Sequence, residues 1–568
     1  MRAVIPKENG QSFLIARTKA ESPQHIVETI GRLERQSDTC YATLNLLGRP
    51  WNYAAWLALT ECVRRIETSL TPNEYGTSKH KILVMNIARV AGQLWKFAHD
   101  GGKPTQCAPS EFRWFPRVAQ ESALAFEVAG PYSQFCLHFP AWHWGLYAVE
   151  IEDATTIRFH VGSSRLARRV SAYGKGIRPG NVTLMTVEEP RELPPPTKAL
   201  SLMFDDAIRT ADGRGLFAVK FGSLKRLRSA LAGMYAERLS AALRRYPTIS
   251  VGSYSLEEFR SFYTGLLAVV GAHEHLCFLW ASGRSRPFDS LVLVHPRLKW
   301  MELISEYSGL AASIVERILP DLIFGAFASQ DLQMTPFVPL ADDNSLLGVV
   351  PHFPLQSNWE ENILRVCSYV RPKIYSQTSL TKEGEMRDRL RSTVKPPCLV
   401  SGPLNLGKGI PDLDLLIEDA ASGTILLAEL KWPRKPYSPR EFPQRDSEIR
   451  KGIAQIKAIK SFLTANPGFL VDRGYVQRSL CDYGRVQYCV VSRDHLIETQ
   501  DAEYPVYAYD VFESELSGSK DMASILVFLN SMDWLPREGE DFTCQWIADK
   551  VAGVTVFSEL FLLKSHGA

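Results

Sequence analysis

The sequence predicts an α/β protein, mixed α+β overall, in which a mixed-sheet domain follows a large, mainly helical N-terminal region. Three observations predict this class. Apolar residues recur at helical spacing over 26–70, 81–99 and 224–245. Two apolar strands, 412–418 and 424–431, are separated only by a short Ala-Ala-Ser-Gly turn. Further helix and strand patterns then alternate, which is typical of a compact domain.

The elements after residue 372 can be placed in order from these patterns. Beyond the two strands of the hairpin, we expect helices over 380–392, 446–464 and 518–533 and strands over 486–492 and 505–511. An antiparallel hairpin followed by strands that are reached through a long helix predicts a sheet with both parallel and antiparallel neighbours.

Changes in composition along the chain divide it into four expected parts. The proline-rich stretch 188–196 reads as a stiff linker, and residues 336–372 read as loop-like. The expected parts are a mixed α/β region (1–190), a mainly helical region (197–372), the mixed-sheet domain (376–515) and a helical C-terminal tail (516–568).

Composition and charge exclude several classes of protein. The 568 residues include 65 Lys and Arg against 62 Asp and Glu, and this near-balance excludes a strongly basic nucleic-acid wrapper but not a local basic channel. There is no run of eighteen apolar residues, so no membrane-spanning helix and no membrane partner are expected. None of the ten cysteines forms a C-x-x-C pair, which favours reduced thiols and a cytoplasmic location.

Charged side chains gather at the hairpin. Because side chains alternate along a strand, Asp412 and Asp414 share one face, as do Glu429 and Lys431. The tight turn brings the two strands side by side, so three carboxylates and one ammonium converge on one sheet surface. Burying such a cluster alone would be costly, and a hard divalent cation such as Mg²⁺, with Mn²⁺ as a substitute, is its natural partner.

The loop length predicts which aspartate faces Glu429. A four-residue loop, 420–423, pairs Asp419 with Thr424, and this register sets Asp414 opposite Glu429 and Asp412 opposite Lys431. A loop shifted by one residue would pair Asp412 with Glu429 instead, but it would leave a glycine in the strand. We therefore expect Asp414 to be the main metal ligand and Asp412 to contribute less.

Pro411-Asp412, Asp414 and Glu429-Leu-Lys431 resemble the PD-(D/E)xK nuclease superfamily, which has the restriction-endonuclease-like fold. The resemblance covers roughly residues 376–515. It implies a Mg²⁺-dependent phosphodiesterase in which the acidic residues hold the metal and Lys431 assists the attacking water. The expected function is hydrolysis of nucleic acid, with DNA favoured over RNA. The alternative is a catalytically inactive adaptor that uses the same fold to bind nucleic acid or a partner protein.

The resemblance also implies supporting residues on the flanking helices. Members of the superfamily often carry a glutamate on the helix before the hairpin, for which Glu385 is the first candidate and Glu383 the alternative. On the helix after the hairpin, Gln455 is expected to support the metal site or a phosphate. Lys451 lies four residues earlier, on the same helical face, and is expected to contact nucleic acid.

Basic and aromatic residues alternate in the loop after Lys431. Arg434, Lys435 and Arg440 lie among Trp432, Tyr437 and Phe442, a mixture that suits phosphate contacts and base stacking. The alternative is a plain basic surface loop. Two basic clusters further upstream, 165–178 and 225–245, are weaker candidates for the same role. The N-terminal region is expected to select the substrate or to bind a protein partner or a second copy.

Overall fold

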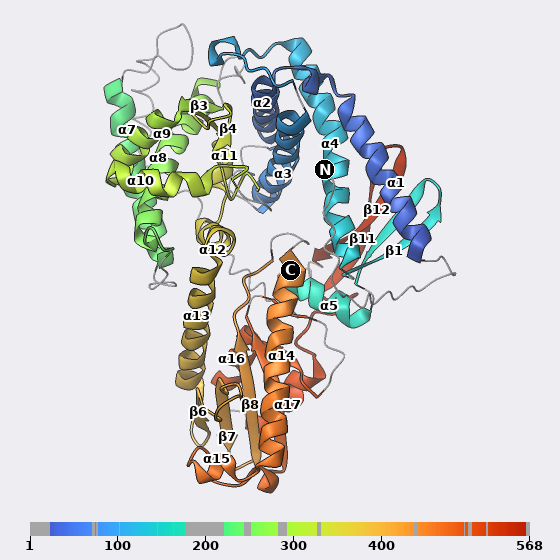
Figure 1. Ribbon diagram of the computed structural model, residues 1–568, viewed down its shortest axis with the longest axis vertical. Helices are drawn as coiled ribbons and strands as arrows, with labels where there is room; N and C mark the ends of the chain where they lie inside the picture. Colours follow the sequence, from blue (N-terminus) through green and yellow to red (C-terminus); the bar gives the residue numbers. More distant parts are fainter. Residues whose placement is uncertain are drawn as a thin grey trace. The chain divides into compact units, whose positions relative to one another are not determined.

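The computed structural model describes most of the chain as two compact units (Figure 1). Unit 1 comprises Met1–Ser37, Gln134–Leu184 and Glu383–Ala568, and unit 2 comprises Asp38–Ser133 and Met185–Lys382. The described residues are 23–70, 74, 78–101, 103–144, 146–162, 164–175, 177, 179, 221–243, 251–281, 292–326, 331–436, 441–493, 495–497, 503–518 and 521–563. The expected linker 188–196 lies outside them.

The expected mixture of helices and strands is confirmed, and no described helix is long and apolar enough to cross a membrane. Along the chain, α1, α4 and α13 each pass from one unit into the other. The helices of unit 2 are α2 (Trp51–Ser69), α3 (Ser78–Gly101), α7 (Phe221–Leu243), α8 (Leu256–Ala281), α9 (Arg297–Ser308), α10 (Ala312–Ile318), α11 (His352–Leu355) and α12 (Trp359–Val370). The remaining helices are α1 (Pro23–Ala42), α4 (Pro116–His143), α5 (Arg165–Gly174), α13 (Pro372–Thr393), α14 (Phe442–Ala465), α15 (Phe469–Asp472), α16 (Tyr509–Ser517) and α17 (Met522–Ser531).

The strands of the described residues form three sheets. Unit 2 holds a three-stranded sheet of β3 (Leu293–Pro296), β5 (Leu346–Val349) and β4 (Val338–Pro339). The larger sheets of unit 1 are a five-stranded one with the order β10-β9-β8-β7-β6 and a four-stranded one with the order β1-β2-β12-β11. Their strands are β1 (Tyr147–Asp153), β2 (Thr156–Val161), β6 (Leu399–Ser401), β7 (Leu415–Asp419), β8 (Thr424–Lys431), β9 (Arg485–Ser492), β10 (Val506–Ala508), β11 (Phe542–Val551) and β12 (Val554–Leu563).

The five-stranded sheet has the predicted mixed character. Strand β8 pairs antiparallel with β7 and parallel with β9, and β9 pairs parallel with β10. Helix α14 supplies the crossover between the parallel strands β8 and β9 and packs against both of them (Figure 1). Strand β7 is buried throughout, and only the last residue of β8 is partly exposed, because central strands of such a sheet are covered on both faces.

The C-terminal segment differs from the expected helical tail. Among its described residues, the end of α16 and the whole of α17 are helical, and the chain then forms the long antiparallel hairpin of β11 and β12. Strand β12 also pairs in parallel with β2, more than 390 residues earlier in the chain. The segment 134–184 therefore belongs with the C-terminal part of the chain in unit 1. The chain changes unit after Leu184 and after Lys382, near the expected boundaries at 190 and 372, whereas no change of unit falls at the expected boundary of 515. Residues 336–372, expected as loop-like, contain β4, β5, α11 and α12.

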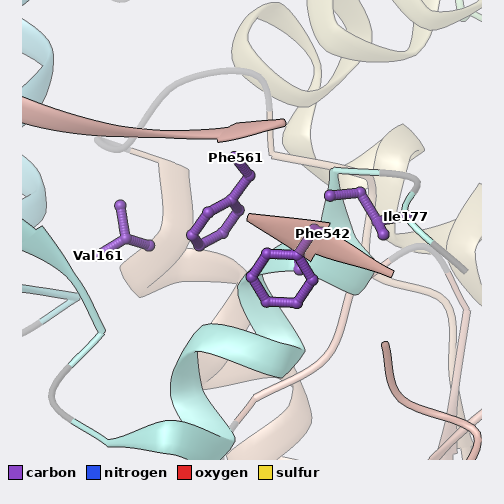
Figure 2. Packing of buried hydrophobic residues seen from close by; sticks show 5 residues of the cluster. Val161, Ile177, Phe542 and Phe561 are labelled. Carbon is purple, nitrogen blue, oxygen red and sulfur yellow. The ribbon is translucent and has the colours of Figure 1, made fainter. Parts of the chain in front are cut away.

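A hydrophobic cluster joins these distant segments. It consists of Val161, Ala172, Ile177, Phe542 and Phe561. Figure 2 shows the rings of Phe542 and Phe561 side by side, with Val161 and Ile177 flanking them. The two ring centroids lie 5.1 Å apart. This packing explains why 134–184 and the C-terminal hairpin fold together, since neither segment could bury these side chains alone.

Candidate active site

The hairpin has the predicted register. Asp419 pairs with Thr424 and Leu415 pairs with Ala428, which places Asp414 next in line to face Glu429. Gly423 closes the loop with φ of +62°, a left-handed backbone that glycine adopts without strain. The Asp419 carboxylate accepts hydrogen bonds from the amides of Ala421 and Ser422 inside the loop. Local turn chemistry therefore fixes the register on which the site depends.

Asp414 lies where the β7–β8 ladder ends. Its Oδ2 atom accepts a hydrogen bond from the amide of Leu430 at 2.9 Å, so its carboxylate takes the position of a backbone acceptor. On the other side of β7, the backbone of Leu413 still exchanges hydrogen bonds with Leu404. The Asp414 carboxylate is therefore held against β8 beside Glu429, as the sequence predicted.

Glu429 and Lys431 form a buried pair on the same face of β8. The Lys431 Nζ atom donates to Glu429 Oε1 at 2.8 Å. The Lys431 side chain is only 12% exposed and the Glu429 side chain only 2%. The second carboxylate oxygen of Glu429, Oε2, is buried with no hydrogen-bond partner among the described residues. Burial raises the pKa of Glu429 to about 8; Lys431 opposes this increase and Asp414 adds to it.

The pKa of Lys431 is also raised, but by the neighbouring carboxyl groups and against the effect of burial. Burial by itself lowers the pKa of Lys431, but the carboxyl groups of Glu429 and Glu383 outweigh burial and the net pKa is raised. Glu383, on α13, accepts a hydrogen bond from the Trp432 amide at 3.2 Å. Burial raises the pKa of Glu383 while Lys431 lowers it. The site thus has three acidic groups around one ammonium.

Of the two upstream glutamates that the sequence suggested, the structure brings the alternative, Glu383, to the end of β8, and not the first candidate, Glu385. Glu383 reaches the strand end, whereas Glu385 is exposed on α13. Two residues along an α-helix correspond to a rotation of about 200°, so Glu383 and Glu385 lie on nearly opposite faces. The sequence suggested both residues but could not reveal which face of α13 packs on the sheet.

Asp412 is not gathered into this group by the structure. It is exposed and precedes the paired part of β7, and it therefore does not lie opposite Lys431 in a continued ladder. The backbone of β7 does not continue the pairing with β8 at Asp414, because the Asp414 side chain, and not its backbone, accepts the hydrogen bond from the Leu430 amide. Asp412 stays a predicted ligand for which the described contacts give no support.

Helix α14 packs over the site at Gly452, a residue for which the sequence patterns predicted no role. A Cβ atom on Gly452 would lie 3.0 Å from Lys431 Cε and 3.5 Å from Glu429 Cγ. Gln455 lies about one turn further along α14; its Oε1 atom is buried and has no hydrogen-bond partner among the described residues. Lys451 is exposed. A lone glycine inside a strongly helical pattern was the available signal, since such a residue usually has a packing reason.

The basic loop after β8 is only partly a surface. Arg434 was expected to contact nucleic acid, but it is 3% exposed and forms a 3.0 Å ion pair with the equally buried Glu441. Lys435 is exposed, and Arg440 lies outside the described residues. The alternation of basic and aromatic residues could not show that Arg434 is buried and Lys435 exposed. The burial of Arg434 depends on its ion pair with Glu441, which lies at the start of the next helix.

Several side chains of the upstream basic clusters interact with residues of their own unit. Arg168 forms ion pairs with Glu538 and Glu559, and Arg169 donates to the backbone carbonyls of Met532, Leu535 and Pro536. In unit 2, Lys225 pairs with Glu306. These side chains are therefore occupied by interactions within their own units.

The donor set fits a divalent cation of the Mg²⁺ type. Among the described residues, no three His, Cys, Asp or Glu side chains form a ready-made metal-binding group. Mg²⁺ is usually held by one or two carboxylates together with water and substrate phosphates. Asp414 and Glu429 meet that requirement, and the buried Oε2 atom of Glu429 lacks a partner that a cation would supply.

Comparisons with known proteins add no family: no protein-family model, curated protein or solved structure matches this chain.

Proposed function

We propose that the chain is a metal-dependent nuclease that hydrolyses phosphodiester bonds in nucleic acid, with a restriction-endonuclease-like core and with DNA as the favoured substrate. One observation carries the proposal: Asp414, Glu429 and Lys431 converge at the ends of adjacent strands, with Glu429 Oε2 buried and unpartnered among the described residues. Titratable groups whose pKa values are perturbed by burial and by a specific charged neighbour are common at functional sites.

The residues would divide the work as follows. Asp414 and Glu429 would hold Mg²⁺, which when bound polarises a phosphoryl oxygen and lowers the pKa of water. Lys431 would stabilise negative charge that develops on the phosphate, since its ammonium is already fixed by Glu429. Glu383 holds the amide of Trp432 and faces the charge of Lys431, so it would keep the strand end and the ammonium in place.

Cleavage assays with the full chain test this proposal. Labelled duplex DNA, single-stranded DNA and RNA would each be incubated with Mg²⁺, with Mn²⁺ and with EDTA. We expect metal-dependent cleavage that Glu429→Gln and Lys431→Met each reduce by at least about 100-fold, because one change weakens metal binding and the other removes a transition-state cation. Asp388→Asn, on the exposed surface of α13, is the matched control and should cleave normally.

A second candidate function rests on the low exposure of the same pair. Glu429 is 2% exposed and Lys431 12%, and a closed site of this kind suits an adaptor that uses the fold without chemistry. The adaptor proposal expects nucleic acid or a protein to bind without metal and without cleavage. Binding that is unchanged by EDTA and by Glu429→Gln, together with no cleavage of any of the three substrates, would favour the adaptor.

A further inference from the structure

We infer that Gly452 is a positioning residue of the candidate site: its missing side chain lets α14 lie close enough to hold the Lys431 chain against Glu429. The role in catalysis rests on the proposed function, whereas the packing role stands on geometry alone. Gly452 is buried near the middle of α14, where glycine is less favourable than alanine in a helix. A packing requirement explains why a residue with low helix propensity occupies this position.

The contacts at Gly452 are tight and specific. A Cβ atom would lie 3.0 Å from Lys431 Cε and 3.1 Å from Lys431 Cγ, both closer than ordinary van der Waals contact. The distance to Glu429 Cγ would be 3.5 Å, which is ordinary contact. An added methyl group would therefore collide with the lysine chain and would leave the glutamate nearly undisturbed.

Neither side of this contact can retreat easily. The end of β8 is fixed, because Lys431 pairs with Ser492 of β9 and its carbonyl accepts from the Arg493 amide at 3.1 Å. A Cβ atom on Gly452 would require Cγ and Cε of Lys431 to move by a few tenths of an ångström, and because Cγ lies close to the backbone this movement turns the side-chain torsions away from their present values. The turn would shift Nζ relative to Glu429 Oε1, which it now contacts at 2.8 Å.

A double-mutant cycle tests the packing role. In the wild-type background, Gly452→Ala should lower the urea midpoint of unit 1, because the collision outweighs the gain in helix propensity. In a Lys431→Ala background the colliding atoms are absent. The same change should then make the unfolding equilibrium constant roughly fivefold smaller, which is the ordinary effect of Gly→Ala inside a helix.

Gly384→Ala is the matched control. Gly384 lies on α13 in the same unit, and its nearest atom is the flexible tip of Arg387 at 3.4 Å. Gly384→Ala should stabilise the wild-type and Lys431→Ala backgrounds by the same amount. Equal stabilisation by Gly452→Ala in both backgrounds would overturn the inference. If Gly452→Ala alone does not fold, recovery of folding in the Lys431→Ala double variant supports the inference, and lack of recovery overturns it.

A second readout separates positioning from general damage. Gly452→Ala alters no proposed metal ligand, so Mn²⁺ affinity measured by calorimetry should stay within about threefold of wild type while cleavage falls at least about tenfold. An equal loss of Mn²⁺ affinity and of cleavage, or no loss of either, would overturn the positioning role in catalysis. If the wild-type chain cleaves nothing, the proposed function fails, and the stability cycle still decides the packing role of Gly452.

Discussion

Burial strongly disfavours the ionised form of Glu429. Its carboxyl group is almost fully buried, one oxygen contacts Lys431, and the other has no described hydrogen-bond partner. Burial outweighs the ammonium, so the pKa is raised to about 8. In the metal-free protein this group therefore retains its proton at neutral pH, and the cost of ionising it is what a bound cation would relieve.

The raised pKa predicts how stability depends on pH. A carboxyl group that binds its proton more tightly in the native state stabilises the fold at low pH, and this stabilisation is lost as pH rises from about 4.5 to about 8. In EDTA, the free energy of unfolding of wild type should therefore fall relative to that of Glu429→Gln over this interval, by up to about 1.4 kcal/mol per pH unit. Urea unfolding of both proteins at several pH values measures the difference, and parallel profiles would contradict the assignment.

The two aspartates should behave differently. Asp414→Ala removes a proposed ligand and leaves the buried Leu430 amide without its acceptor, so we expect loss of Mn²⁺ binding and about 1–3 kcal/mol of destabilisation. Asp412 is exposed, and Asp412→Ala should change stability by less than about 0.5 kcal/mol and weaken metal binding only modestly. Calorimetric titration with Mn²⁺ compares them; normal affinity in Asp414→Ala with none in Asp412→Ala would reverse the roles.

At the scale of elements, the loop that joins β8 to α14 combines a structural ion pair with an exposed cation. Arg434 and Glu441 are each about 3% exposed or less, and their charges form a buried ion pair, so removing either charge is expected to be costly. Lys435, the next residue, is exposed. Neighbouring basic residues therefore have different consequences when they are replaced.

This contrast gives a prediction about nucleic-acid binding. Lys435→Ala should weaken binding and reduce the slope of log affinity against log salt by about 1, because one phosphate contact is lost. Arg434→Ala should leave that slope unchanged but cost about 3–5 kcal/mol of stability, because it leaves Glu441 charged and buried. Fluorescence anisotropy across a salt series, together with urea unfolding, measures both. A reduced slope in folded Arg434→Ala would show that the arginine contacts phosphate after all.

At the scale of the whole molecule, unit 1 is assembled from distant stretches of sequence. Its four-stranded sheet takes β1 and β2 from the first third of the chain and β11 and β12 from the C-terminal end. A buried hydrogen bond from the Val161 amide to the Glu559 carboxylate, 2.9 Å long, connects them. The upstream segment is therefore part of the same compact unit as the candidate site.

The shared core predicts energetic coupling across 381 positions of sequence. Phe542→Ala should destabilise unit 1 by about 3–5 kcal/mol, because the ring is fully buried. Combined with Val161→Ala, the loss should differ from the sum of the single losses by about 0.5–3 kcal/mol, since both residues belong to one cluster. The pair Phe542 and Ile456, which share no such cluster, should be additive. Additivity in the first pair would argue against the joint core.

Sequence alone determined the local features of the candidate site. The length of the 420–423 loop and its terminal glycine predicted the register, and the structure has it. The apolar run of β8 predicted a covered central strand, which is also observed. These features depend on neighbours within about 20 residues, where strand alternation and turn chemistry leave few choices.

Only the tertiary structure decided the features that depend on distant partners. The face of α13 that packs on the sheet brings Glu383, and not Glu385, to the end of β8. The packing of α14 on β8 places Gly452 beside Lys431. Strands β11 and β12 pair with each other across a short turn, and their place in a four-stranded sheet depends on β2, which lies far away in the sequence. Helix phase, burial of charge and strand pairing across long separations are set by the packing of the whole unit, and local sequence patterns do not specify them.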